Sequence, residues 1–120
     1  MSNNEPQLLA IITGGASGIG LSVTKRFLLE GYKVLILDAN QAAGESVLND
    51  LKSNTYSIDF IHCDITMHKQ IESIFKTLGD NNSPAHVLVN CAGISPALNA
   101  LHQYPVEEWP RAIDINLHGT

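Results

Sequence analysis

The sequence predicts an α/β fold in which helices cover both faces of a parallel sheet, a doubly wound arrangement. Short apolar runs of strand length alternate along the chain with stretches that have the apolar spacing of a helix. The apolar runs are nearly continuous, as in strands buried on both faces. A β-α-β-α-β-α-β order joins parallel strands by right-handed crossovers. We expect strands at residues 7–13, 33–37, 58–63 and 86–89.

Each stretch between two strands places apolar residues three and four positions apart, so that they form one stripe on a helix. The stripes comprise Ile19, Val23 and Phe27, then Ala43, Val47 and Leu51, then Ile71, Ile74, Phe75 and Leu78. Gly31 and Gly79 are expected to end helices, and Thr66 to begin one. The stripe of a last helix, inside which the chain ends, comprises Val106, Trp109, Ile113 and Leu117. Pro110 is tolerated in the first turn of that helix.

Length and composition place the chain among ordinary globular domains. Its 120 residues suffice for one domain, spanning 1–120, with a real core, since 44% are apolar and 16% charged. The formal net charge is -5 and lysine and arginine are scattered, so we expect no binding to nucleic acid or to a membrane surface. No apolar run approaches the roughly 20 residues that cross a bilayer.

The start of the chain and its cysteines and histidines indicate a cytoplasmic protein without a metal site. Residues 1–7, MSNNEPQ, lack the basic start and apolar run of a signal peptide. Cys63 and Cys91 have no CxxC spacing, so we expect reduced thiols. The five histidines have no spacing that is typical of metal ligands.

A glycine-rich run, ITGGASGIGLS at residues 12–22, lies between the first expected strand and the first expected helix. Gly14 suits a tight turn, Gly18 lets a ligand approach the backbone, and Gly20 lets the helix pack closely on the strand. The free N–H groups and positive dipole at the start of the helix suit a pyrophosphate. The spacing of a P-loop is also present, but Leu21 stands where that motif needs lysine, which disfavours a nucleoside triphosphatase.

Asp38 ends the second expected strand about 20 residues after the glycines, where a carboxylate can accept hydrogen bonds from an adenosine ribose. The same carboxylate would repel the 2′-phosphate of NADP. Ser17 and Ala39, on either side of the expected ribose, supply no cation for that phosphate. The sequence therefore favours NAD over NADP as cofactor. A role of Asp38 as a helix cap or turn residue stays open.

TGGASGIG at residues 13–20 resembles the TGxxxGxG signature of the classical short-chain dehydrogenases/reductases. NCAG at 90–93 resembles the NNAG motif of that family, CDIT at 63–66 its Asp-hydrophobic pair beside adenine, and DINLHGT at 114–120 its asparagine-containing fifth helix. The resemblance implies a Rossmann-like sheet, truncated after the fourth strand and the start of the following helix, as in the amino-terminal half of the family domain. The fourth strand is then expected at the edge of a sheet with the spatial order 3-2-1-4, and its open edge predicts marginal stability or self-association.

The resemblance also implies roles for particular residues. Those expected along the dinucleotide phosphates are Gly14, Ser17, Gly18, Ile19 and Gly20. Asp38 is expected at the adenosine ribose, and Asp64 and Ile65 beside adenine. Those expected along the second ribose and nicotinamide are Asn90, Ala92, Gly93 and Ile94. Asn116 matches the asparagine of the family's catalytic tetrad, which supports the active lysine through a water and a backbone kink.

Members of this family move hydride between nicotinamide and an alcohol or carbonyl substrate. A tyrosine acts as acid and base, a lysine lowers its pKa, and a serine positions the substrate oxygen. None of the three tyrosines here has lysine four positions later. We therefore expect the cofactor-binding half of an NAD-dependent oxidoreductase that acts on a small-molecule alcohol or carbonyl and forms homo-oligomers. The alternatives are a dinucleotide-binding module without catalysis and a truncated product that does not fold alone.

Overall fold

The computed structural model describes residues 7–52, 54–95 and 100–120, so the polar start of the chain lies outside the described residues. Four parallel strands form one sheet in the order β3-β2-β1-β4. The strands are β1 (Leu9–Thr13), β2 (Lys33–Asp38), β3 (Ile58–His62) and β4 (Val87–Asn90). The predicted doubly wound α/β fold and its strand order are confirmed, with strand ends shifted by one or two residues.

The register of the sheet brings the carboxyl ends of the strands to one edge. Thr13 on β1 pairs with Leu37 on β2 and with Asn90 on β4. Asp38 pairs with His62 on β3. Ligands of such sheets bind outside the carboxyl ends of the strands, so this edge is where a site is expected.

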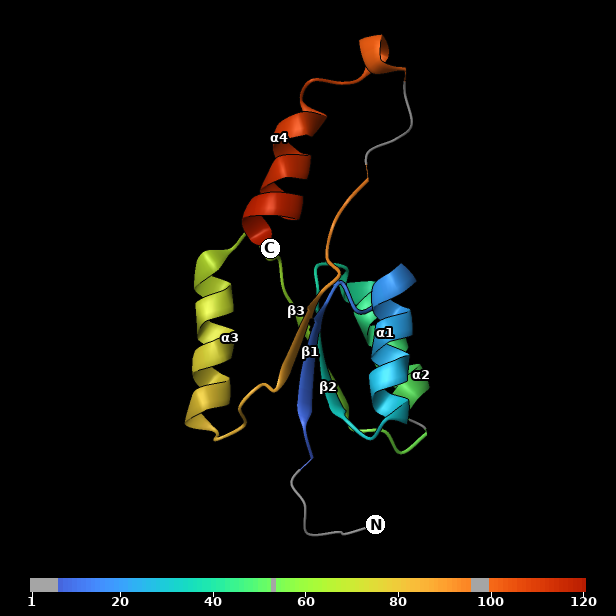
Figure 1. Ribbon diagram of the computed structural model, residues 1–120, viewed down its shortest axis with the longest axis vertical. Helices are drawn as coiled ribbons and strands as arrows, with labels where there is room; N and C mark the ends of the chain where they lie inside the picture. The colour runs from blue at the N-terminus through green and yellow to red at the C-terminus, as the bar shows by residue number, and fades with distance from the viewer. Residues whose placement is uncertain (1–6, 53, 96–99) are drawn as a thin grey trace.

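Helices cover both faces of the sheet (Figure 1). The helices α1 (Gly18–Leu29) and α2 (Gln41–Lys52) lie on one face, and α3 (His68–Asp80) lies on the other. Successive strand residues point to opposite faces. The core on the side of α1 and α2 includes Ala10, Ile12, Val34 and Ile36. The core on the side of α3 includes Leu9, Ile11, Leu35, Leu37 and Ile74. The continuous apolar runs in the sequence thus reflect strands that are buried on both faces.

Two predicted helix boundaries differ from the structure. α3 begins at His68 rather than at Thr66, because the backbone N–H and the hydroxyl of Thr66 both donate to Asp64. α3 also continues through Gly79, and the left-handed residue beyond its end is Asn82, with φ 52°. Threonine and glycine often mark helix ends. Here the side chain of Asp64 accepts both hydrogen bonds from Thr66 before the helix begins, and Gly79 is still part of the helix.

After β4 the chain runs through a short 3-10 helix, η1 (Leu101–Gln103), into α4 (Glu108–Ile113), which continues as a π-helix, η2 (Asp114–Gly119). α4 and η2 stand beyond the carboxyl end of the sheet (Figure 1). The predicted last helix therefore exists, but it changes its hydrogen-bond pattern at Asp114. The residues predicted as its apolar stripe are exposed in the described structure: Trp109, Ile113 and Leu117 on α4 and η2, and Val106, which lies in the turn before α4. No helix in the described ranges has the length and apolar character needed to span a membrane.

Candidate functional site

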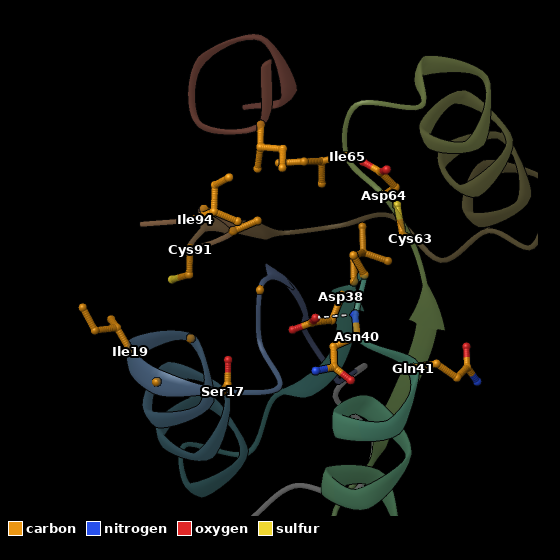
Figure 2. Close-up of a pocket in the computed structure, with 18 of the residues that line it drawn as sticks. Ser17, Ile19, Asp38, Asn40, Gln41, Cys63, Asp64, Ile65, Cys91 and Ile94 are labelled. Atoms are coloured by element: carbon orange, nitrogen blue, oxygen red, sulfur yellow. Dashed lines mark hydrogen bonds between the residues drawn. The ribbon is translucent and has the colours of Figure 1, made fainter. Parts of the chain in front are cut away.

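A cavity of about 1060 Å³ opens at the carboxyl end of the sheet. The segment after each strand contributes to its wall, and α4 with η2 forms its roof. Figure 2 shows side chains that reach this space from separate elements: Ser17 and Ile19 from the start of α1, Asp38 from the end of β2, Asp64 from the exit of β3 and Cys91 from the exit of β4.

Most residues predicted for the site line this cavity. They are Gly14, Ser17, Gly18, Ile19, Gly20, Asp38, Asp64, Ile65, Ala92, Gly93 and Ile94. Two predicted residues do not line it. Asn90 is the last residue of β4, and Asn116 hydrogen-bonds to Ile94 from η2. The parallel topology thus gathers segments that are far apart in the sequence.

The glycine-rich loop after β1 brings bare backbone to the cavity wall. Gly14 has φ 63°, a conformation that favours glycine. A Cβ at Gly14 would lie 2.7 Å from the Cα of Ala92, and a Cβ at Gly20 would collide with the carbonyl oxygen of Gly14. Only residues without side chains therefore let β1, α1 and the exit of β4 approach one another this closely.

Gly18 and Ser17 form a cradle at the amino end of α1. Gly18 has φ 54°. Apart from its chain neighbours and the nearby backbone of its own helix, no atom of the described chain lies within 4 Å of the place its Cβ would occupy. Ser17 is the N-cap residue, yet its side chain makes no capping hydrogen bond in the described structure, and its oxygen points toward the open space (Figure 2). With the unpaired N–H groups of the first helical turn, these residues fit an anion such as a phosphate.

Asp38 connects two segments of the cavity wall, the glycine-rich loop after β1 and the turn after β2. Its Oδ2 accepts the N–H of Ala16 at 3.1 Å, and its Oδ1 accepts the N–H of Asn40 at 2.9 Å. The turn role that the sequence left open is therefore present. Each carboxylate oxygen can accept a further hydrogen bond. Since Asp38 also lines the cavity, hydroxyl groups of a ligand can donate to it.

Thr13, the last residue of β1, shapes the opposite wall. Its Oγ1 accepts the N–H of Cys91 and the N–H of Ala92, both at 3.1 Å. These bonds hold the chain where it leaves β4, so that residues 92–94 follow the cavity. A buried side chain on the central strand thus sets the path of a segment almost eighty residues later.

Asp64 and Ile65 follow β3 and complete the wall. The Oδ1 of Asp64 accepts the hydroxyl of Thr66 at 2.7 Å and its N–H at 2.9 Å. These two bonds, the hydroxyl first, lower the pKa of Asp64 below its ordinary value, and nearby His62 contributes. Burial raises the pKa of the Cys63 thiol, and Asp64 raises it further. At neutral pH this wall therefore carries an ionised carboxylate and a protonated thiol.

The roof is attached to two of these segments. Oδ1 of Asn116 accepts the N–H of Ile94 at 2.8 Å, and Nδ2 of Asn116 donates to the carbonyl of Ile94 at 2.9 Å. Further along η2, a Cβ at Gly119 would lie 2.7 Å from Cγ1 of Ile65. Hydrogen bonds thus hold η2 to the exit of β4, and close packing sets it against the exit of β3.

Sequence reasoning did not assign several lining residues to the site. They are Leu37, Asn40, Gln41, Ala42, Cys63, Cys91, Arg111 and Ile115. Ala39, which the sequence places beside the expected ribose, lines the cavity too. Cys91 lies inside the NCAG motif, so its position in that motif is the signal that could have identified it. Arg111 and Ile115 share one helix face through their spacing of four, which the sequence shows. Nothing local in the sequence indicates that this helix covers the cavity.

A model of the short chain dehydrogenase family matches residues 8–120. The chain belongs to this family. 3-Hydroxyacyl-CoA dehydrogenase type-2 of Rattus norvegicus is 34% identical over 118 residues, which cover 94% of this chain and 44% of that protein. The uncharacterized oxidoreductase YxbG of Bacillus subtilis (strain 168) is 30% identical over 111 residues, which cover 92% of this chain and 41% of that protein.

Solved structures of similar proteins share the arrangement. The crystal structure of gox2181 matches with a TM-score of 0.85 and 26% identity, over 96% of this chain and 45% of that one. A variant of actinorhodin polyketide ketoreductase, solved with NADPH, matches with a TM-score of 0.82 and 29% identity, over 94% of this chain and 43% of that one. The chain thus spans less than half the length of these relatives and corresponds to the amino-terminal part of the family domain. The predicted family and Rossmann-like fold are confirmed.

Proposed function

We propose that this chain is the cofactor-binding portion of an NAD-dependent oxidoreductase. The complete enzyme would transfer hydride between nicotinamide and an alcohol or carbonyl group of a small-molecule substrate. The observation that carries the proposal is the carboxylate of Asp38 on the wall of the same cavity as the bare amino end of α1. A dinucleotide needs both features, because its phosphates require a cradle of N–H donors and its adenosine ribose requires an acceptor.

The pyrophosphate belongs at the amino end of α1 in this proposal. The residues assigned to it are Gly14, Ser17, Gly18, Ile19 and Gly20. Gly18 leaves open the space that a side chain would fill. The side-chain oxygen of Ser17 points toward the cavity (Figure 2). A pyrophosphate there gains the N–H groups and the positive dipole of the helix end.

The adenosine belongs between the ends of β2 and β3, with Asp38 at the ribose and Asp64 and Ile65 beside adenine. Asp38 favours NAD, because its negative charge would lie near the 2′-phosphate of NADP. Arg111 is the cation among the described lining residues, and it stands on α4, within 3.9 Å of Glu108, rather than on β2 or α2. One solved relative carries NADPH, so the preference rests on the residues of this chain.

The nicotinamide end belongs along the exit of β4 and under the roof. The residues assigned to it are Asn90, Ala92, Gly93 and Ile94. Bound nicotinamide supplies the acceptor or donor of hydride. Asn116, assigned to the catalytic machinery, holds both backbone groups of Ile94 and so orients this wall.

The proton-transferring Tyr-x-x-x-Lys pair of the family does not occur in these 120 residues. We therefore expect the chain to bind NAD and not to turn over a substrate alone. A second candidate function is a dinucleotide-binding module without catalysis, which predicts the same binding but no activity in a longer chain. The homo-oligomeric state and the cytoplasmic location stay predictions.

Calorimetric titration of the 120-residue chain with NAD and with NADP tests the proposal. We expect NAD to bind more tightly. Asp38→Ala removes an acceptor with full charge, so it should weaken NAD binding by about tenfold or more. It should also shift the ratio of the two affinities toward NADP, because the repulsion of the 2′-phosphate is lost.

The affinity ratio is the informative quantity, since Asp38 also holds Ala16 and Asn40 and its loss loosens the site for either ligand. Asp80→Asn is the matched control, because this exposed carboxylate pairs with Lys76 on α3 and should change neither affinity. Equal binding of NAD and NADP by the unaltered chain, or an unchanged ratio in Asp38→Ala, contradicts the NAD preference. Binding of neither ligand contradicts the dinucleotide site.

A further inference from the structure

A buried hydroxyl stands beneath the glycine-rich loop. Thr24 lies on α1 and is 0% exposed. Its Oγ1 donates to the carbonyl oxygen of Gly15 at 3.1 Å. A threonine inside a helix commonly bonds to the carbonyl four residues earlier, in its own helix. This hydroxyl instead reaches nine residues back, out of the helix and into the loop.

Gly15 is shaped to receive this hydroxyl. A Cβ at Gly15 would lie 2.9 Å from Oγ1 of Thr24 and 3.2 Å from the Cβ and the carbonyl oxygen of Ile12. Gly15 is not among the glycines with positive φ, so its backbone conformation would accept alanine. Packing against Thr24 and Ile12, rather than backbone conformation, therefore requires glycine at this position. The hydroxyl at 24 and the missing side chain at 15 form one contact.

The peptide between Gly15 and Ala16 links Thr24 to the cavity wall. Gly15 does not line the cavity, but Gly14 before it and Ser17 after it do. The N–H of Ala16 donates to Asp38. One peptide unit, between Gly15 and Ala16, is therefore held at both of its polar groups, the carbonyl by Thr24 and the N–H by Asp38.

We propose that Thr24 is a positioning residue for the dinucleotide phosphates: its hydroxyl holds the Gly15 carbonyl against α1, so that the loop presents its cavity face to the pyrophosphate. This proposal deepens the proposed function and rests on it. Without the hydroxyl, the interior carbonyl of Gly15 loses its partner, and the loop must rotate this peptide to satisfy it. That rotation moves Gly14 and Ser17, which contact the ligand in the proposed site.

Two substitutions separate this role from simple filling of the core. Thr24→Val keeps the shape of the side chain and removes the hydroxyl. Thr24→Ser keeps the hydroxyl and removes a buried methyl group, so it also destabilises the fold. If Thr24 only fills the core, the loss of ligand affinity should follow the loss of stability in each variant. If Thr24 positions the loop, affinity should be lost only in the variant without the hydroxyl.

Calorimetric titration with NAD and with ADP-ribose, beside thermal melting of each variant, makes the comparison. Thr24→Val should weaken both ligands by about tenfold, the effect of one lost hydrogen bond in a preorganised loop. Thr24→Ser should bind both within about twofold of the unaltered chain even where its melting temperature is lower. Unaltered binding by Thr24→Val, or an equal loss in Thr24→Ser, overturns the proposal.

Hydrogen exchange without ligand keeps this test separate from the proposed function. The Ala16 amide should exchange faster in Thr24→Val than in the unaltered chain. The Ile36 amide in the centre of β2 reports global opening, and the change at Ala16 should exceed any change at Ile36. Equal exchange at Ala16 overturns the positioning role. If the unaltered chain binds no dinucleotide, the proposed function fails, and the role of Thr24 for a pyrophosphate fails with it, whatever the exchange shows of the loop.

The contact between the two side-chain positions has its own test. Gly15→Ala should weaken NAD, because the new methyl meets Oγ1 of Thr24. Thr24→Ala removes that oxygen, so the loss in the double variant should be smaller than the product of the two single losses. Losses that multiply without interaction overturn the direct contact.

Discussion

Thr13, Asp38 and Asp64 all stand where a strand ends or has just ended, and each uses a side-chain oxygen to accept backbone N–H groups of the segments that form the cavity wall. Such bonds are local in space and directional, so they place the backbone more narrowly than apolar packing does. Thr13, Asp38 and Asp64 thus fix the loops whose residues would contact a dinucleotide.

The carboxyl of Asp64 offers a prediction that depends on pH. The Thr66 bonds lower its pKa in the folded chain, so they stabilise the fold above the unfolded pKa of about 4, and this contribution is lost as pH falls through the folded pKa. Thr66→Val removes the hydroxyl donor and should raise the pKa of Asp64 toward its ordinary value. Carbon-detected NMR titration of the carboxyl measures it. Thr77→Val, which removes a hydroxyl bonded to Ser73 on α3, should leave it unchanged.

Gly18 and Gly31 allow a matched comparison, because both have positive φ and at neither position would a Cβ meet described atoms beyond the chain neighbours and the nearby helix backbone. Alanine at either position should cost about 1 kcal/mol of folding stability through backbone strain. Only Gly18→Ala should weaken NAD, since only Gly18 lines the cavity. Chemical denaturation and calorimetry measure the two effects. Equal NAD affinity in both variants would contradict the cradle at the start of α1.

At the scale of secondary-structure elements, the roof decides whether the site is an open edge or a cavity. η2 meets the exit of β4 through Asn116 and Ile94, and the exit of β3 through Gly119 and Ile65. In these contacts the segments after β3 and β4 do not touch each other. Each of them contacts η2 instead. A shift of this one element therefore moves both ends of the proposed dinucleotide site.

Gly119→Ala tests the seat of the roof. The added methyl would meet Cγ1 of Ile65, so η2 should move away from the β3 exit and NAD should bind several-fold more weakly. Gly79→Ala is the control, because Gly79 is also helical and has open space where its Cβ would stand. That change should leave NAD binding unaltered and raise stability by up to about 1 kcal/mol, the helix preference of alanine over glycine. Equal binding by the two variants would show that Ile65 does not seat η2.

At the scale of the whole molecule, the two faces of the sheet are covered unequally. Ile61 on β3 lies beside Leu37, and Leu88 on β4 lies beside Ile11, so both point to the face of α3. Ile61 is 37% and Leu88 51% exposed. α3 thus covers the central strands and leaves apolar side chains of both outer strands accessible. Outer strands of this kind favour association with other chains.

We therefore expect the 120-residue chain to self-associate through β4. Leu88→Lys places a charge on the exposed face of this outer strand and should increase the monomer fraction. Leu29→Lys adds the same charge at an exposed apolar position on α1, away from the sheet edge, and should not. Sedimentation velocity over a range of protein concentrations measures the association. A monomeric unaltered chain at every concentration would refute this prediction.

The sequence by itself determined the alternation of strands and helices, the family, and most residues that line the cavity, because these depend on local periodicity and on short motifs. The NAD preference and the residue roles stay predictions from the same motifs. Local signals were less reliable at helix ends: Thr66 and Gly79 are typical end residues, but the hydroxyl of Thr66 bonds to Asp64, and α3 continues past Gly79.

Only the tertiary structure decided which distant residues meet. Arg111 and Ile115 line the cavity because η2 is tied to the exits of β3 and β4, and Thr24 meets Gly15 because α1 packs beneath its own leading loop. In the sequence Thr24 is one polar residue in a helical stretch and Gly15 one glycine among several. The hydrogen bond between them needs the right distance and direction between the Thr24 hydroxyl and the Gly15 carbonyl. The packing of complete elements sets that distance and direction, and local periodicity in the sequence does not reveal them.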